Sequence, residues 1–237
     1  MDEAFYALYS ALDRGGPGEE GDVAWAFKLA GLAASARICD AGCGTGGDIP
    51  ALLAAAPEGR ITALDIERRF VDEVLARFGD DERVTAYRAD FVKLKGPFDL
   101  IWCAGAAYFL GLAKALNAWR PALAPGGAIA FSKPAFFVEQ PSDRAIAFWG
   151  GFRARQASAI LADVTAQHYE ILGERRLSET AWDRYYRPLR AEIDALRSAG
   201  AVSEAMQAVL ATASAEIETW HHVKDETGYL LVVARPR

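Results

Sequence analysis

Short β-prone runs alternate with helix-like segments between residues 37 and 132, and this alternation restricts the fold more than any other feature. The runs lie at residues 37–41, 60–64, 83–88, 98–103 and 128–132, and helix-like segments such as 48–56 and 68–78 separate them. Each of these segments can cross over a sheet, so the pattern predicts parallel strands with helices on both faces. In such folds, ligands bind beside the carboxyl ends of the strands.

The remaining segments are less regular. A helix is expected at about 22–32, after an aromatic segment at 5–9 and a turn-rich patch at 14–18. A polar break at 141–144 begins a stretch rich in Trp, Tyr and Arg, which we expect to form a helical cap, and a final strand is expected at 229–234.

Composition argues against several classes of partner. A net charge of -6 and a pI near 5.2 give no broad attraction to nucleic acid or anionic lipid. No leader or membrane-spanning run is visible in the sequence, so a cytoplasmic location is expected. Cys39, Cys43 and Cys103 are odd in number and are expected to be reduced thiols, and no second cluster completes a metal site.

The segment at 38–48, ICDAGCGTGGD, places four glycines and two aspartates between a predicted strand and a predicted helix. Gly42, Gly44 and Gly46 let the main chain turn sharply and approach a ligand without a Cβ clash. Because Gly42, Gly44 and Gly47 also fit Gly-x-Gly-x-x-Gly, the spacing leaves open a nicotinamide dinucleotide and other adenosine-bearing cofactors.

Carboxylates lie at the ends of three consecutive predicted strands. Asp40 is at the first, and Asp65 ends the second about twenty residues beyond the glycine turn, where a carboxylate can accept hydrogen bonds from both ribose hydroxyls. Asp90 ends the third and is followed by Phe91, so it can accept a hydrogen bond from an adenine amino group. Three acids along one sheet edge favour an adenosine site.

With ITALDI, RADF and LAPGGAIAFSKP, this glycine turn resembles the successive signatures of class I S-adenosylmethionine-dependent methyltransferases. The resemblance implies an α/β, Rossmann-like, seven-stranded, mostly parallel sheet with a reversed C-terminal hairpin. It also implies S-adenosylmethionine as cofactor and S-adenosylhomocysteine as product. We therefore expect a single domain at 1–237, with an N-terminal helical segment at 1–33, a cofactor-binding core at 34–135, the cap insertion and later sheet elements at 136–225, and the last strand at 226–237.

The resemblance also implies a set of cofactor contacts along the sheet edge. In chain order these are Asp40 at the amino-acid portion, Gly42, Cys43, Gly44 and Gly46 in the turn beneath it, Asp65 with Ile66 after it at the ribose, Asp90 and Phe91 at the adenine, and Cys103 and Ala104 beside the methionine moiety.

The pieces FYALYSAL, RGGPG, IWCAGAAYFLG and SETAWDRYYRPL resemble a subgroup of bacterial small-molecule methyltransferases. The segment that usually reads Trp-Ser-Glu-Gly-Ala there is Trp102-Cys103-Ala104-Gly105-Ala106 here, and Lys133 replaces a usual Glu. This chain lacks both acids, so no role of theirs is transferred to it.

The expected acceptor is a small molecule, and no catalytic residue is assigned because orientation alone can drive methyl transfer unless the acceptor arrives protonated. Aromatic faces and basic groups suit a flat, cationic or acidic acceptor. The candidates are Tyr6, Tyr9, Arg14, Tyr108, Lys133, Trp182 and Tyr185. Core packing competes with this role for Trp182 and Tyr186, which are four apart on a predicted helix.

Three other functions use the same turn. A dehydrogenase accounts for the glycines and Asp65 but not for Asp90, and an aminopropyl transferase generally needs an acid in the segment WCAGAAYF. A non-catalytic cofactor-binding sensor or scaffold is favoured by the two missing acids. The sequence leaves open the acceptor, the methylated atom, and whether the protein is a monomer or a homodimer.

Overall fold

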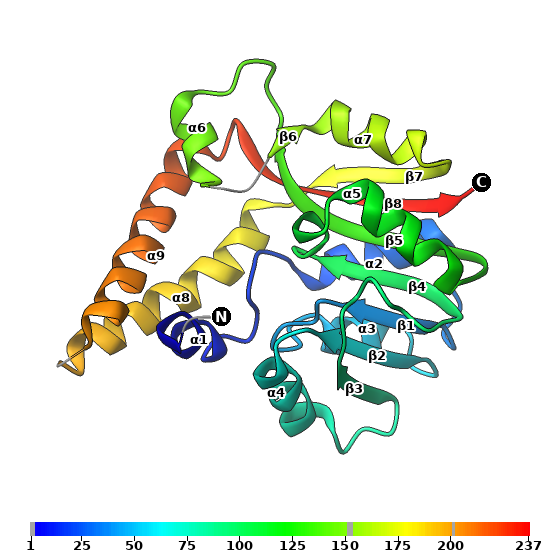
Figure 1. The fold of residues 1–237 in the computed structure, drawn as a ribbon, viewed down its shortest axis with the longest axis horizontal. Helices are drawn as coiled ribbons and strands as arrows, with labels where there is room; N and C mark the ends of the chain where they lie inside the picture. Colours follow the sequence, from blue (N-terminus) through cyan, green and yellow to red (C-terminus); the bar gives the residue numbers. More distant parts are fainter. Residues whose placement is uncertain (1–2, 151–153, 201) are drawn as a thin grey trace.

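A computed structural model describes residues 3–150, 154–200 and 202–237 and contains one central mixed sheet (Figure 1). Seven strands follow the order β3-β2-β1-β4-β5-β8-β7, and the two-residue β6 pairs with β5. The strands are β1 (Arg37–Ala41), β2 (Arg60–Asp65), β3 (Val84–Arg88), β4 (Phe98–Ala104), β5 (Leu123–Phe136), β6 (Arg155–Gln156), β7 (Tyr169–Arg176) and β8 (Thr227–Pro236).

The strand directions confirm the predicted Rossmann-like sheet. Strands β3, β2, β1, β4 and β5 are parallel, whereas β8 pairs antiparallel with both β5 and β7. The seven strands implied by the resemblance are therefore present, and β6 adds an eighth. In β1, Ile38 and Cys39 point to opposite faces and both are fully buried, as expected for a central strand covered on two sides.

Helices cover both faces of the sheet. Apolar side chains of α2 (Glu20–Ala30), α3 (Ile49–Ala55) and α4 (Arg68–Phe78) pack in one core cluster, while α5 (Leu112–Trp119) and α7 (Ala157–Ala166) contribute to the other. The short 3-10 helices η1 (Ala107–Phe109) and η2 (Arg120–Ala122) flank α5. Because helices lie on both faces of the sheet, the ligand site is expected at the carboxyl ends of the parallel strands.

A helical cap lies beyond those strand ends (Figure 1). It contains α1 (Glu3–Ser10), α6 (Asp143–Phe148), α8 (Glu179–Ser198) and α9 (Glu204–Val223). Ser178 and Ser203 precede the two long helices, and each side chain accepts a first-turn backbone N–H. The cap shares an apolar cluster with the sheet, because Leu8, Trp182 and Trp220 belong to the same cluster as Ile38.

Two segments differ from the sequence expectation. The strand expected at 128–132 extends over Leu123–Phe136, because β8 pairs with it as far as Phe136 and a register shift near Phe98 absorbs the Pro-Gly-Gly turn. The second segment is β7, one of the later sheet elements expected within 136–225, whose position the local sequence pattern does not give. Its polar sequence YEILGERR hides it, since β8 supplies the pairing on one side only.

Within the described ranges, no helix combines the length and apolar character needed to span a bilayer.

Candidate functional site

The glycine turn joins β1 to α3 and is held against β2. Gly42, Gly44 and Gly46 have φ of 83°, 52° and 84°, a region that L side chains rarely adopt. The N–H groups of Gly42 and Cys43 donate to the Leu64 carbonyl at 2.8 and 2.9 Å. A Cβ on Gly42 would lie 2.7 Å from the Ala106 Cβ, so the turn also touches the segment after β4. Glycine at 42 therefore lets two strand ends approach each other.

Asp65 ends β2, and its carboxylate fixes the turn. Gly44 N–H donates to one carboxylate oxygen at 3.0 Å and Glu67 N–H to the other at 2.9 Å. Burial raises the pKa of Asp65, and these backbone hydrogen bonds oppose the shift. Ile66 follows with 59% of its side chain exposed. Asp65 can still accept hydrogen bonds from a ligand, since each carboxylate oxygen has two lone-pair sites.

Asp40 in β1 is a buried carboxylate whose Oδ2 has no hydrogen-bond partner among the described residues. Burial raises its pKa well above the ordinary value, and the negative charges of Asp48 and Asp65 add to the shift, whereas Arg14 opposes it. A buried acceptor of this kind suits a donor that a ligand supplies, and a cationic donor suits it best.

Asp48, at the start of α3, connects this site to the N-terminal segment. Its Oδ1 accepts from Arg14 Nη2 at 2.9 Å, and its Oδ2 accepts from Trp102 Nε1 at 2.9 Å. Arg14 was predicted as a substrate residue, and the structure pairs it with this carboxylate. Neither Asp48 nor Trp102 was predicted as a site residue, although Asp48 lies in the glycine segment and its proximity to Asp40 could have been suspected.

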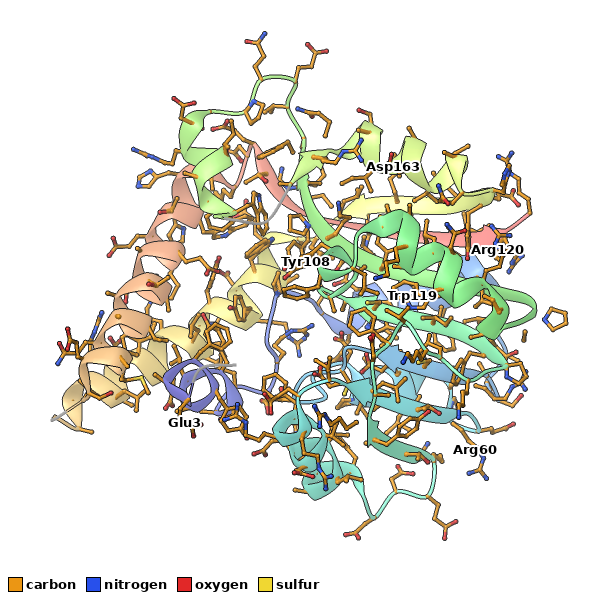
Figure 2. The ribbon with its side chains drawn as sticks, viewed as in Figure 1. Glu3, Arg60, Tyr108, Trp119, Arg120 and Asp163 are labelled. Atoms are coloured by element: carbon orange, nitrogen blue, oxygen red, sulfur yellow. The ribbon has the colours of Figure 1, made fainter. Side chains whose placement is uncertain are left out.

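The third acid lies farther along the edge. Asp90 follows β3 by two residues and is exposed, and its Oδ1 accepts from the Val92 N–H at 3.0 Å. Phe91 is buried beside Gly42, and its carbonyl accepts from Trp119 Nε1 at 2.7 Å. Trp119 lies on α5 in front of the sheet (Figure 2). The structure thus brings Asp40 and Asp65 together and puts Asp90 in the loop after β3, the next strand outward.

The end of β4 carries Cys103 and Ala104. Cys103 is fully buried, and burial raises the pKa of its thiol far above the ordinary value, so it stays protonated at neutral pH. The Gly105 N–H donates to Ser132 Oγ at 2.9 Å, which holds this strand end against β5.

The residues predicted to bind the methyl acceptor do not all lie in one place. Tyr9 of α1 and Tyr185 of α8 are buried, and Trp182 of α8 is buried against Trp220 of α9. Tyr108 lies at the end of β4 that faces the cap (Figure 2). Tyr6 instead packs on α4, where its hydroxyl bonds to Glu73 and Arg69 lies over its ring.

Lys133 is apart from these aromatic residues. It is buried on β5, in the alternation that points Phe131 and Ala135 toward α5 and α7. Burial lowers the pKa of Lys133, Arg155 adds to that shift and Asp163 opposes it. The structure therefore does not group Lys133 with the tyrosines of the cap.

Two residues that sequence reasoning missed complete this region. Tyr229 on β8 is buried, and Glu216 on α9 accepts a hydrogen bond from Tyr186. The only sequence signal for Glu216 is its spacing of four residues from Trp220, which is also typical of ordinary helix packing.

Comparisons with known proteins give a family match over part of the chain and solved structures of similar fold over its whole length. Residues 38–127 match a family model described as a methyltransferase domain. The fold resembles a S-adenosylmethionine-dependent methyltransferase from Geobacter sulfurreducens in complex with S-adenosylhomocysteine, with a TM-score of 0.85, 20% identity, and coverage of 100% of this chain and 99% of the other. It also resembles such an enzyme from Thiobacillus denitrificans in the same complex, with a TM-score of 0.84, 21% identity and the same coverage. The comparison with curated proteins gave no match.

Proposed function

Because residues 38–127 match the methyltransferase domain family, we propose that this protein transfers a methyl group from S-adenosylmethionine to a small-molecule acceptor. The observation that carries the proposal is the buried Asp40 oxygen, which has no hydrogen-bond partner in the described part of the chain, beside a glycine turn that Asp65 holds in place. An amino-acid ammonium group fits the first feature, and ribose hydroxyls fit the second.

In this proposal the residues at the strand ends divide the cofactor between them. Asp40 binds the amino group of the amino-acid portion above the turn formed by Gly42, Cys43, Gly44 and Gly46. Asp65, with Ile66 after it, contacts the ribose, and Asp90 and Phe91 contact the adenine. Cys103 and Ala104 lie beside the methionine moiety. Each of these assignments is carried over from the resemblance to class I S-adenosylmethionine-dependent methyltransferases.

Binding orients the reacting groups. When bound, S-adenosylmethionine supplies an electrophilic methyl group on a positively charged sulfur. Asp40 and Asp65 fix two parts of the cofactor, and the buried cap side chains exclude water from the space beyond β4. Holding the acceptor atom in line at about 3 to 3.5 Å from the methyl carbon can account for several kcal/mol of the barrier.

The cap supports a small acceptor. Helices α1, α8 and α9 lie across the strand ends, and buried Tyr9, Trp182 and Tyr185 fill the space between them. We further propose that the enzyme acts in the cytoplasm as a monomer or homodimer, where its three buried free cysteines suit a reducing environment.

The test combines cofactor binding with turnover. Asp65→Ala should weaken S-adenosylmethionine binding by about 1–3 kcal/mol, because the ribose hydroxyls and the Gly44 N–H lose their acceptor. Calorimetry measures this change, and Asp80→Ala, which removes an exposed carboxylate at the opposite strand edge, should leave the affinity unchanged. Unaltered affinity in Asp65→Ala would contradict the placement of the cofactor.

Turnover distinguishes the enzyme from a sensor. Incubation with fractionated metabolites should release S-adenosylhomocysteine from at least one fraction. Tight cofactor binding without release from any fraction would support the non-catalytic alternative, which the absence of acids at Ala104 and Lys133 favours.

A further inference from the structure

Glu216 is a partly buried carboxylate that the proposed cofactor site does not use. It lies on α9, and Tyr186 of α8 donates its hydroxyl hydrogen to Glu216 Oε1 at 2.9 Å. Burial raises the pKa of Glu216, and the hydrogen bond from Tyr186 opposes the shift. A carboxylate in this position costs free energy unless something positive neutralises it.

Aromatic rings cluster around Tyr186, the hydrogen-bond partner of this carboxylate. The ring centroids of Trp182 and Trp220 lie 5.4 and 6.3 Å from that of Tyr186, and Tyr185 lies at 5.0 Å. Trp182 and Trp220 stack at 3.8 Å, and Tyr229 lies 5.6 Å from Trp182. We call Glu216 with Tyr9, Tyr108, Trp182, Tyr185, Tyr186, Trp220 and Tyr229 the cap cluster.

The charge of Glu216 acts on all five tyrosines of the cap cluster. Burial is the main cause that raises the pKa of each phenol, and the negative charge of Glu216 adds to every shift, for Tyr9, Tyr108, Tyr185, Tyr186 and Tyr229. These tyrosines belong to α1, η1, α8 and β8, and Tyr186 is the one that donates a hydrogen bond to Glu216.

The cap cluster lacks a positive partner for that carboxylate. Across residues 3–150, 154–200 and 202–237, no ion pair joins Glu216 to a lysine, arginine or histidine. In the same part of the chain, the buried Trp182 Nε1 has no hydrogen-bond partner. A purely packing cluster would need neither an ionisable group nor an unpaired donor.

The cap cluster borders the proposed reaction centre. Gly105 follows Ala104 at the end of β4, and a Cβ there would lie 3.4 Å from the Tyr229 ring. Tyr108 lies at the same strand end (Figure 2). Its ring centroid is 6.5 Å from that of Tyr229. A ligand held by the cap cluster therefore lies next to the place proposed for the methionine moiety.

We propose that Glu216 and the aromatic rings of the cap cluster bind a positively charged nitrogen of the methyl acceptor, so that the acceptor is a small organic cation. This inference rests on the proposed function and names its substrate class. The faces of Trp and Tyr rings attract ammonium groups, and a carboxylate among them adds charge and selects against acidic and neutral molecules.

The experiment compares two probes of nearly equal shape that differ in charge. Choline and its neutral isostere 3,3-dimethyl-1-butanol are titrated into the full-length protein saturated with S-adenosylhomocysteine, and binding is followed by tryptophan fluorescence. Choline should bind at least about tenfold more tightly than the isostere, which corresponds to the discrimination expected of a cation site.

Two single substitutions on α9 test whether choline binds at Glu216. Glu216→Gln keeps the shape of the side chain and should weaken choline binding at least about tenfold without changing S-adenosylhomocysteine affinity. Glu218→Gln, an exposed position on the same helix, should change neither. Circular dichroism confirms that both variants are folded.

The outcomes separate the two proposals. Equal binding of choline and the isostere, or undiminished choline binding in Glu216→Gln, overturns the cation site while the cofactor site stands. Failure of S-adenosylhomocysteine to bind overturns the proposed function, and the acceptor role of the cap cluster falls with it. Methyl transfer to acidic or neutral acceptors only would also overturn the cation site.

Discussion

At the residue scale, Asp40 combines a proposed role in cofactor binding with a cost to the stability of the folded protein. Its pKa in the folded chain is raised well above the ordinary value, mainly by burial. The unfolded chain therefore releases the Asp40 proton at a lower pH than the folded chain does. As a result, the stability of the cofactor-free protein falls as the pH rises from the ordinary aspartate range toward the folded-state pKa.

Asp40→Asn should remove this pH-dependent cost. The variant should have a higher free energy of unfolding than the wild type at about pH 8, and the difference should shrink as the pH falls below about 4, where Asp40 is protonated in both the folded and the unfolded chain. Urea unfolding without cofactor measures it. The same variant should bind S-adenosylmethionine at least about tenfold less tightly, because a hydrogen bond to a charged group contributes about 1.5–3 kcal/mol. A variant less stable than the wild type at every pH would show that the Asp40 charge is already compensated.

Gly42 tests the close approach of two strand ends. Alanine there must adopt φ of 83° and place its Cβ 2.7 Å from the Ala106 Cβ. Gly31→Ala is a matched control, since Gly31 has φ of 63° but open space around its Cβ position. We expect Gly31→Ala to cost about 1–2 kcal/mol from the backbone alone. Gly42→Ala should cost more and also weaken cofactor binding. Equal losses of unfolding free energy in the two variants, measured by chemical denaturation, would contradict the expected clash with the Ala106 Cβ.

At the scale of elements, one ion pair connects α2 to β7. Asp22 is buried, caps the start of its own helix by accepting from the Glu19 N–H at 2.9 Å, and pairs with Arg175. Burial raises the pKa of Asp22, and Arg175 opposes the shift. The Asp22 carboxylate both caps the start of α2 and pairs with Arg175. Its loss should therefore weaken the first turn of α2 and the attachment of α2 to β7 at the sheet edge.

Asp22→Ala should lower the free energy of unfolding by about 1–3 kcal/mol, less than for a fully buried pair because Arg175 is partly exposed and can rehydrate. The control is Asp72→Ala, which removes the exposed pair between Asp72 and Arg68 on α4 and should cost about 0.3–0.5 kcal/mol. Urea unfolding of both variants decides the point, and equal losses would mean that Asp22 contributes no more than a surface carboxylate.

The elements also show which strands can be predicted from local sequence patterns. The strands β1, β2 and β4 lie within one or two residues of their predicted ranges, because buried central strands carry continuous apolar runs. The sheet elements expected within 136–225 include β7, but its local pattern does not place it because it is polar and paired on one side only. Asp40 and Asp65 could be proposed as site residues because they end predicted strands. Glu216 and Tyr229, which we propose as acceptor-binding residues, are brought to the cap by long-range packing that no spacing in the sequence encodes.

At the scale of the whole molecule, the cap and the sheet share a hydrophobic core. The cluster that contains Ile38 of β1 also contains Leu8 of α1, Trp182 of α8 and Trp220 of α9. The long helices leave the sheet after β7 and return to it as β8, so both ends of the insertion are tied to the sheet. This continuity supports the proposal that residues 1–237 form one domain.

A single domain predicts one cooperative unfolding transition. Far-ultraviolet circular dichroism, which follows all helices, and tryptophan fluorescence, which follows Trp149, Trp182 and Trp220 near the cap together with Trp25, Trp102 and Trp119 on α2, β4 and α5, should give coincident denaturation curves. Addition of S-adenosylhomocysteine at about a hundred times its Kd should move both curves together, by about 2.7 kcal/mol. If the fluorescence transition came first and did not respond to the ligand, the cap would unfold separately from the sheet. The shared core would then be too weak to couple them, and the cap residues would have to be ordered by the acceptor itself.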